Sequence, residues 1–590
     1  MKNKKTLLFL LLVVGVVYFN GLFSGFVWSD RSLIIGKQEF FSHARNALTV
    51  LASPDMGLED RHATPYYRPL NTLTYMLDSH LWGLHPFWYH LENVLLHALV
   101  AALFYLLLVE VFEDRRLAFI ASVLFAVYPV NAEAVDAIFN RNVILCAFFS
   151  LVCLICIKKG GLKWTVVSLL AYCLALLSKE PAVILPFFLL SYVLAGKGFV
   201  SGMEYLRAKN KRTAAAGFFA ITVLYFIIRY RVLGALTSEA GVGLSPARLQ
   251  LISSVYFEHF RLMIFPFRLN ANYTVKWLSF SWFKAAGAVF GVLLLVYFSL
   301  ARKIPGPVRA GALWIFWGLL PVSNIVKIPS APVAEKYEYT IILGFCLILG
   351  YLLSGLHDKK KRVGAAVIVA LALALGLRTF ERNFVWQDDA SLYSSMIDAD
   401  PGNAVAHCNL GCYYAQNGSF DGAMRELRTA LSINPRLAKA WMDLGVIYSG
   451  RGLFSDSERQ LKTALALDPG LAEAHLDLAV TYDKEGRLPD SVRQLRTALG
   501  IYPGLSEARL DLGVAYEEEG RLEDAIQEYR MAAGLDPGLL KAHLLLGTCY
   551  QREGFFEEAA GEYQYSLKLD PGNVQALEYL NGIERRNNEK

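Results

Sequence analysis

The chain has 590 residues, of which 55% are hydrophobic, and its mean hydropathy is +0.35. This composition is too apolar for a soluble protein of this length, and the excess lies before residue 380. Residues 401–590 carry 20 Lys and Arg against 28 Asp and Glu, a net charge of −8; the whole chain is +6, so residues 1–400 carry +14. A basic membrane half followed by an acidic tail argues against a nucleic acid as partner.

The N-terminal segment Met1–Lys5 is basic, and an apolar stretch follows it near 7–27. No small-residue cleavage site follows, so we expect a retained signal anchor whose N-terminus is cytoplasmic. Ten further apolar segments predict membrane helices, which gives about eleven spans. These segments lie near 88–112, 117–130, 142–157, 164–178, 181–196, 213–229, 284–301, 308–323, 338–356 and 362–380.

Alternating the direction of these spans places five turns rich in Lys and Arg on the cytoplasmic side, as the positive-inside rule requires. The agreement holds if the segment 256–267 does not cross the membrane. That segment carries Glu258, His259 and Arg261, and we expect an interfacial or re-entrant helix there. The C-terminal part of the chain then lies on the non-cytoplasmic face.

Ionisable side chains gather in the turns expected on that same face, including a long first loop near 28–87. Ordinary interfacial solvation explains any one of them, but it explains their convergence less well, and ionisable groups beside apolar helices suggest a functional site. The candidate residues are Asp30, Arg68, Glu133, Arg141, Lys179, Arg229, Arg231, Glu335, Lys336 and, within one of these turns, Tyr337.

The eight cysteines show no metal-ligand pattern, and no metal site is expected. Cys153 and Cys156 form a CxxC, but it lies inside an apolar run, where packing residues are expected. Cys408 and Cys412 lie one helical turn apart, where simple packing is favoured over a disulfide.

Six prolines recur every 34 residues at the end of the chain, which is the tetratricopeptide period. Leu, Gly or Ala, and Tyr repeat in the same register. The pattern predicts five repeats over 404–573, a capping helix and tail over 574–590, and a linker or half-repeat over 381–403. The concave face of such an array is suited to bind extended peptide or another protein. Recruitment of a protein is favoured over a spacer or oligomerisation role, because the array shares the face of the candidate site.

Several motifs keep their order along nearly the whole chain and resemble those of the transmembrane-and-tetratricopeptide-repeat family, which is similar to the protein O-mannosyltransferases. The motifs are Phe26–Asp30, Tyr67–Leu70, His90–His97, Leu124–Val135 with Arg141, Leu177–Pro181 and Ala334–Tyr339.

The resemblance implies an all-α protein: a membrane domain of the glycosyltransferase C type over 1–380, followed by the tetratricopeptide superhelix. It also implies transfer of a sugar, with mannose the expected one, from a polyprenyl- or dolichyl-phosphate carrier to Ser or Thr hydroxyls of exported proteins. The implied partners are the lipid-linked donor, membrane lipids and a protein acceptor. No cofactor, metal or nucleotide-sugar is implied, because the carrier is one phosphate on a lipid.

In this fold the catalytic base is a carboxylate just after the first span, and Asp30 fills that position. We expect it to deprotonate the acceptor hydroxyl in an inverting transfer. Cations must stabilise the departing phosphate, and Arg141, Lys179, Arg229, Arg231 and Lys336 are the candidates. Arg68, Glu133, Glu335 and Tyr337 are further candidate site residues. The family usually shows two adjacent acids where this chain has Ser29 and Asp30, so only the second is kept.

Two alternatives remain open from the sequence. One is a non-catalytic, membrane-anchored scaffold whose repeats assemble an envelope complex, and the other is a transferase acting on a lipid or glycan. The expected location is a bacterial inner membrane with periplasmic repeats, or an endoplasmic reticulum membrane with lumenal repeats in a eukaryote.

Overall fold

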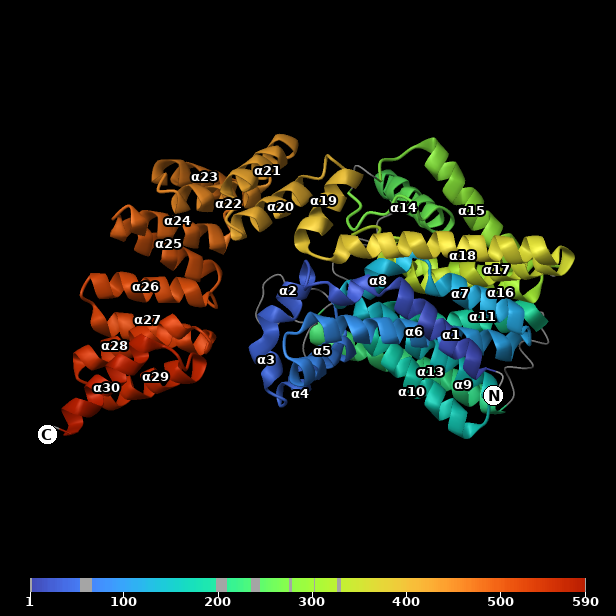
Figure 1. Cartoon of the computed structure of the whole chain (residues 1–590), viewed down its shortest axis with the longest axis horizontal. Coiled ribbons are helices and arrows are strands. Elements are labelled where there is room, and N and C mark those ends of the chain that lie inside the picture. Colours follow the sequence, from blue (N-terminus) through green and yellow to red (C-terminus); the bar gives the residue numbers. More distant parts are fainter. Residues whose placement is uncertain are drawn as a thin grey trace. The chain divides into compact units, whose positions relative to one another are not determined.

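The computed structural model describes residues 3–52, 66–197, 209–234, 245–274, 278–301, 303–325 and 331–588. Within these residues every regular element is a helix, as the all-α expectation required. The chain divides into two compact units, Met1–Pro401 and Gly402–Lys590. Figure 1 shows long helices in the first unit and stacked helix pairs in the second. Parts of the predicted first loop (53–65) and of the basic turn 197–212 lie outside the described residues.

The first unit begins with one apolar helix and a set of short helices. Leu10 and Val14 of α1 are buried, so this helix packs on the unit's core. Pro69 and Pro86 begin α5 and α6, where a missing N–H costs no helical hydrogen bond. The bounds are α1 Lys4–Val17, α2 Ser29–Leu33, α3 Gln38–Ser42, α4 Asn46–Ala52 and α5 Pro69–Trp82.

Six helical segments of the described chain are long and apolar enough to cross a membrane. In Figure 1 the last two, α17 and α18, run side by side, and their packing contacts agree. The protein is therefore a multi-pass membrane protein. The six helices are α6 Pro86–Phe112, α9 Arg141–Lys159, α13 Lys209–Leu233, α15 Trp282–Leu300, α17 Glu338–Lys359 and α18 Lys361–Asn383.

The other predicted spans correspond to shorter or bent helices. The span predicted at 117–130 is α7, which is followed after a 52° bend by α8, and this pair counts as a seventh span if it crosses as one. The predicted segment 256–267 overlaps the C-terminal part of α14, which is not among the six. The count of eleven spans stays a prediction. The bounds are α7 Arg115–Ala126, α8 Ala132–Asp136, α10 Leu162–Ser178, α11 Leu185–Lys197, α14 Pro246–Ile264 and α16 Gly306–Leu319.

Local sequence explains how two of these helices join and how two others pack. After α6, Glu113 takes a left-handed conformation (φ 57°, ψ 13°), and the side chain of Asp114 then caps α7 by accepting from two backbone amides. Small residues let α16 and α17 approach closely, since a Cβ added at Gly344 would lie 2.7 Å from the Gly311 carbonyl oxygen. Close packing through small residues is typical of membrane helices.

The second unit consists of five helix pairs and a final helix, which confirms the predicted tetratricopeptide array. Its glycines act as predicted. Gly418 opens the first inter-helix turn with φ 77°, and a Cβ at Gly513 would lie 2.6 Å from the Tyr529 ring. The pairs are α20 Ala404–Gln416 with α21 Phe420–Ile433, α22 Ala438–Gly450 with α23 Phe454–Leu467, α24 Ala472–Lys484 with α25 Leu488–Ile501, α26 Ser506–Glu518 with α27 Leu522–Leu535, and α28 Leu540–Glu553 with α29 Phe556–Leu569; α30 Val574–Asn588 follows.

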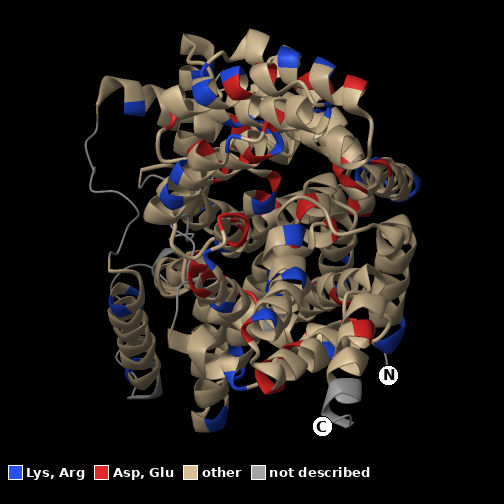
Figure 2. Cartoon of the chain, turned by 90° about the vertical axis from the view of Figure 1, so that its left-hand side faces the viewer, with Lys and Arg blue, Asp and Glu red and all other residues tan. Residues whose placement is uncertain are grey.

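Charges of both signs are interspersed along the helices (Figure 2). In the array several of them pair between successive repeats, as Arg451 does with Asp421 at 2.7 Å. Exposed pairs of this kind contribute at most about 1 kcal/mol each, so the buried Leu, Ala and Tyr positions stabilise the array. The helix expected as a half-repeat is α19, Asp389–Ala399, and it lies in the first unit.

Candidate functional site

The predicted site residues converge at one end of the helices of the first unit. They lie at or near the C-terminal ends of α1, α10 and α13 and the N-terminal ends of α9 and α17. Antiparallel packing of the helices brings these ends together. Asp30 contacts Phe139, and Phe139 contacts Lys336. Arg68 belongs to a second group of contacts, which it joins through Glu180. Residues from six distant segments therefore meet at this end.

Asp30 lies on the short helix α2 and has no exposed surface. Its Oδ2 accepts from the Val27 amide at 3.2 Å, and its Oδ1 accepts from the Phe139 amide at 2.7 Å. Burial raises the pKa of Asp30 to about 7, although these amide hydrogen bonds oppose the rise. A carboxyl with this pKa exchanges a proton near neutral pH, as a general base must.

The turn that carries Asp30 is strained and is held by a second carboxylate. Trp28 has φ 49° and ψ −116°, a conformation that side-chain-bearing residues rarely adopt and that is concentrated at functional sites. Asp389 Oδ1 accepts from the Trp28 amide at 2.7 Å, and Asp389 Oδ2 lies 2.8 Å from Arg31 Nε. The charge of Asp389 contributes to the raised pKa of Asp30. The family's second acid is Ser29 in this chain, and Asp389 supplies a carboxylate beside the same turn.

Four cations gather next to this turn, and we call Arg68, Lys179, Arg229 and Lys336 the cation cluster. Lys336 Nζ lies 5.0 Å from the centroid of the Phe139 ring, whose own backbone amide holds Asp30. Its charge is partly balanced because Lys336 Nζ lies 3.6 Å from Glu133 Oε1.

Arg68 and Arg229 share a single carboxylate, Glu180. Arg68 donates to both Glu180 oxygens at 3.0–3.3 Å, and Arg229 Nη1 lies 3.0 Å from Glu180 Oε1. The guanidinium of Arg68 also lies 3.9 Å above the Tyr66 ring. Glu180 therefore joins Arg68 and Arg229 in one ion-pair group.

Lys179 is the least balanced member of the cation cluster. Its side chain is only 7% exposed, and its ammonium lies 5.4 Å from the centroid of the Tyr337 ring. Among the residues that the structure describes, no carboxylate lies within 4.0 Å of Lys179 Nζ. Burial, together with the charges of Arg68 and Lys336, lowers the pKa of Lys179 to about 7. Glu133 and Glu180 are the carboxylates that pair with members of the cation cluster in the described part of the chain.

Arg141 lies in a different ion-pair cluster. Its Nη1 contacts Asp78 and lies 3.3 Å from Glu92, its Nε donates to Asn93 at 2.8 Å, and its Nη2 donates to the Tyr89 carbonyl at 3.2 Å. Arg141 is fully buried, so every nitrogen of its guanidinium already has a protein acceptor. Arg141 therefore has a structural role, holding α5, α6 and α9 together.

The remaining predicted residues divide between the cluster's surroundings and the surface. Glu335 is buried and pairs with Arg382 of α18 at 2.9 Å. Tyr337 supplies the ring beside Lys179. Arg231 is exposed, and no ion pair within the described part of the chain joins it to the cation cluster. The sequence analysis missed Asp389, Asp78 and Arg382, because their partners are 47 to 361 residues away and no local pattern marks them.

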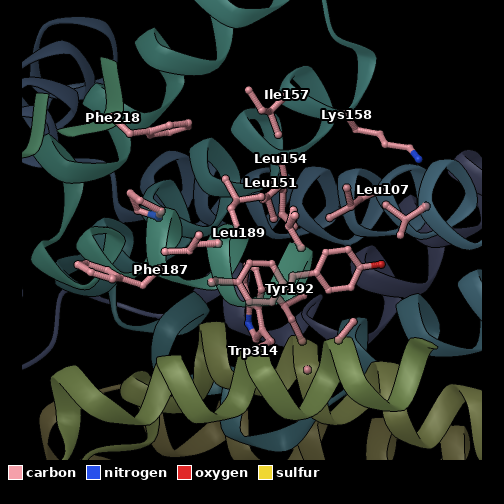
Figure 3. Close-up of a pocket in the computed structure, with 18 of the residues that line it drawn as sticks. Leu107, Leu151, Leu154, Ile157, Lys158, Phe187, Leu189, Tyr192, Phe218 and Trp314 are labelled. Atoms are coloured by element: carbon pink, nitrogen blue, oxygen red, sulfur yellow. The ribbon is translucent and has the colours of Figure 1, made fainter. Parts of the chain in front are cut away.

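An apolar cavity of about 570 Å³ lies toward the opposite ends of the same helices. On α9 it is lined by Leu151, Leu154 and Lys158, whereas Arg141 begins that helix. Figure 3 shows the labelled aliphatic and aromatic side chains around this space, with the amine of Lys158 at its margin. The chemistry-bearing residues are at the cation cluster, so we place the candidate site there and regard the cavity as a separate apolar feature.

These features define a multi-pass membrane protein with a tetratricopeptide array. Tetratricopeptide repeat models match residues 404–437, 447–506 and 484–539. Among solved structures, the protein MamA is 26% identical over 28% of this chain and 95% of its own, with a TM-score of 0.25.

The predicted resemblance to the transmembrane-and-tetratricopeptide-repeat family is confirmed by similar proteins. Protein O-mannosyl-transferase TMTC3 of Mus musculus is 25% identical over 480 residues, which are 73% of this chain and 51% of that protein. Protein O-mannosyl-transferase F38B6.6 of Caenorhabditis elegans is 26% identical over 450 residues, which are 73% of this chain and 63% of that protein. The chain thus spans about half to two thirds of the length of these relatives.

Proposed function

We propose that this protein is a membrane glycosyltransferase that moves a sugar, with mannose the expected one, from a polyprenyl-phosphate carrier to Ser or Thr hydroxyls of proteins. The observation that carries the proposal is the buried, unbalanced ammonium of Lys179 inside a cluster of four cations. An uncompensated charge in such a position is costly, and a bound phosphate would offset that cost. The names of the similar proteins support the same reaction class.

In this proposal Lys179 and Lys336 contact the carrier phosphate, while Arg68 and Arg229 hold Glu180 beside them. The acceptor hydroxyl oxygen attacks the anomeric carbon as Asp30 removes its proton, and the bond from that carbon to the phosphate oxygen breaks. The phosphate leaves with the bonding electrons, and the cation cluster stabilises the charge as it develops. Attack opposite the leaving group inverts the anomeric configuration.

Access to Asp30 requires a movement, because its carboxylate is buried and bonded to two amides. The strained turn at Trp28 stores the energy that makes such a movement accessible. Once Val27 or Phe139 releases an oxygen, a carboxylate with a pKa near 7 faces the Lys336 side of the cluster. Lys336 is tied to that turn through the Phe139 ring.

The carrier's tail and the acceptor chain need separate surfaces. The apolar cavity between α6, α9 and α13 supports binding of an isoprenoid tail within the membrane. The array supports recruitment of an extended protein segment along its concave face. On this proposal both the cluster and the array lie on the non-cytoplasmic face.

The burial of Asp30 also favours one alternative function, a non-catalytic scaffold in which Asp30 only shapes the loop after α1.

The test compares transfer in membranes that contain the wild type, Asp30→Asn or Lys179→Met and are supplied with a panel of radiolabelled polyprenyl-phosphate sugars. Transfer by the wild type, lowered by about 10²-fold or more in Asp30→Asn, supports the enzyme. Lys159→Met, which removes an exposed lysine at the other end of α9, outside the lining of the apolar cavity, is the matched control.

Absence of transfer from every donor, with folded protein in the membrane, would reject the enzyme in favour of the scaffold. Transfer that persists in Asp30→Asn but is lost in Lys179→Met would keep the phosphate site and remove Asp30 as the base. Label found in lipid or glycan and not in protein would keep the chemistry and change the acceptor.

A further inference from the structure

Two cysteines and an aspartate converge where the first two repeats pack together. Cys408 and Cys412 lie one turn apart on α20, and Asp443 lies on α22 of the next repeat. Cys412 Sγ donates to Asp443 Oδ2 at 2.8 Å, and Cys408 Sγ lies 3.5 Å from the same oxygen. Candidate ligand atoms of the three residues all lie within 4.8 Å of one another. All three belong to the second unit and lie outside the site described above.

The register of the array shows that packing alone does not call for these thiols. At the positions equivalent to Cys408 the later repeats carry Met or Leu, and at those equivalent to Cys412 they carry Val or Thr. Only the first repeat replaces both apolar positions with cysteine, and it does so opposite an acid. The equivalent residues are Met442, Leu476, Leu510 and Leu544 for Cys408, and Val446, Val480, Val514 and Thr548 for Cys412.

The geometry of this group matches a tetrahedral zinc site. With Zn–S near 2.3 Å and Zn–O near 2.0 Å, a sulfur and an oxygen on the same ion lie about 3.5 Å apart. Cys408 and Asp443 already have that separation, and Cys412 would move from Asp443 by less than about 1 Å as its S–H···O bond is replaced by coordination. We propose that Cys408, Cys412 and Asp443 bind one Zn²⁺, with water or a partner's side chain as the fourth ligand.

The ligand chemistry selects zinc over the other common ions. Two thiolates exclude Mg²⁺ and Ca²⁺ as preferred occupants, and the carboxylate disfavours Cu⁺, which prefers sulfur and nitrogen. On binding, each thiol releases its proton to solvent, so three anionic ligands and one Zn²⁺ leave a net charge of −1. Lys439 lies one turn before Asp443 on α22, so its ammonium supplies the balancing charge.

This proposal revises the expectation of no metal site. Two cysteines separated by three residues are a weak signal, and the third ligand lies 31 residues further along the chain, in a position that only the stacking of repeats reveals. A zinc ion here would crosslink α20 to α22. It would fix the angle between the first two repeats, since two ligands come from α20 and one from α22.

The test is a Co²⁺ titration of the reduced, full-length chain in detergent. We expect one Co²⁺ per chain, with sulfur-to-cobalt charge-transfer absorption, visible bands of tetrahedral geometry and stoichiometric displacement by Zn²⁺. Cys412→Ser should lower the charge-transfer absorption at least about two-fold, because one of the two thiolates is lost, and Asp443→Asn should weaken binding by at least about 10-fold. Cys549→Ser and Asp477→Asn are matched controls, because one removes a buried thiol and the other the equivalent acid of the next repeat.

A second measurement needs no variant. Cys412 is only partly buried, so alkylation of the wild type followed by peptide mass spectrometry should show that Zn²⁺ protects Cys412 at least about 10-fold relative to metal-free protein. A wild type without charge-transfer absorption, equal loss in the Cys549→Ser control, or alkylation of Cys412 unchanged by Zn²⁺ would each overturn the proposal. Recovery of the chain with Cys408 and Cys412 joined as a disulfide that persists in reductant would also overturn it.

Discussion

Replacing Lys179 by Met should move stability and activity in opposite directions. Lys179 is 7% exposed, and its ammonium faces the Tyr337 ring. Arg68 and Lys336 are the cations whose charges lower the pKa of Lys179. Methionine keeps an unbranched chain of similar length and removes the charge. If the ammonium is present to bind an anion, removing it relieves a cost in the free protein and abolishes a contact in the complex.

The size of the gain follows from the pKa of Lys179, which falls from 10.5 to about 7 on folding. At about 1.4 kcal/mol per unit, the charged amine costs ~5 kcal/mol more in the protein than in water. Because the folded pKa lies below the unfolded value, this penalty is full below pH 7 and disappears as the pH rises through 10.5. Lys179→Met should therefore raise the free energy of unfolding by up to ~4 kcal/mol at pH 7 and by about half of that at pH 9.

The assay compares thermal unfolding midpoints in detergent at pH 7 and pH 9 with transfer rates in membranes. Arg382→Met is the matched contrast, because Arg382 pairs with the buried Glu335 at 2.9 Å and its removal leaves that carboxylate without the ion partner. We expect it to lower stability by about 3 kcal/mol. A Lys179→Met variant that is less stable than the wild type, or one that transfers sugar at the wild-type rate, would refute the reasoning.

Three further changes have defined outcomes. Lys179→Arg should abolish the alkaline fall in transfer rate that begins near pH 7, because guanidinium keeps its proton; a kcat/KM profile from pH 5 to pH 10 measures this, with an unchanged alkaline limb counting against it. Arg141→Met should cost about 3–5 kcal/mol by leaving Asp78 buried without its ion partner, so folded protein is lost rather than transfer alone, as size-exclusion recovery from detergent will show. Gly513→Val should lower the stability of the array by about 1–3 kcal/mol because its Cβ meets the Tyr529 ring, and hydrogen exchange across α26 and α27 would reveal no change if this is wrong.

The array could be predicted almost completely because its order is local and repeated. Each 34-residue period contains its own turn glycine, its small packing residues and its terminal proline. The structure shows the predicted five pairs. The membrane unit was less predictable at its breaks. The apolar run 117–130 predicts one span, but Pro129 starts a new turn after Val127, and the chain bends by 52°. A hydropathy pattern does not contain the direction of the segment after a break.

The candidate site was predictable as a set of residues and not as a set of pairs. Charge beside apolar helices located Asp30, Lys179 and Lys336 on one end of the unit. Hydropathy could not show that the guanidinium nitrogens of Arg141 all donate to protein acceptors, because Asp78 and Asn93 lie 63 and 48 residues away in the sequence. Nor could it show that Asp389 reaches the turn of Trp28 from 361 residues further on.

The contrast among the buried cations is the strongest argument that one end of this unit binds an anion. Arg141 and Arg382 each have a carboxylate at hydrogen-bonding distance, and both are fully or almost fully buried. A fold under selection for stability alone would balance Lys179 in the same way, since the same helices supply acids nearby. Lys179 instead interacts more strongly with the charges of Arg68 and Lys336 than with that of Glu180, and its ammonium lies 5.4 Å from the centroid of the Tyr337 ring. The missing negative charge is what a lipid-linked phosphate would bring, and its arrival would raise the pKa of Lys179 back toward that of a free lysine.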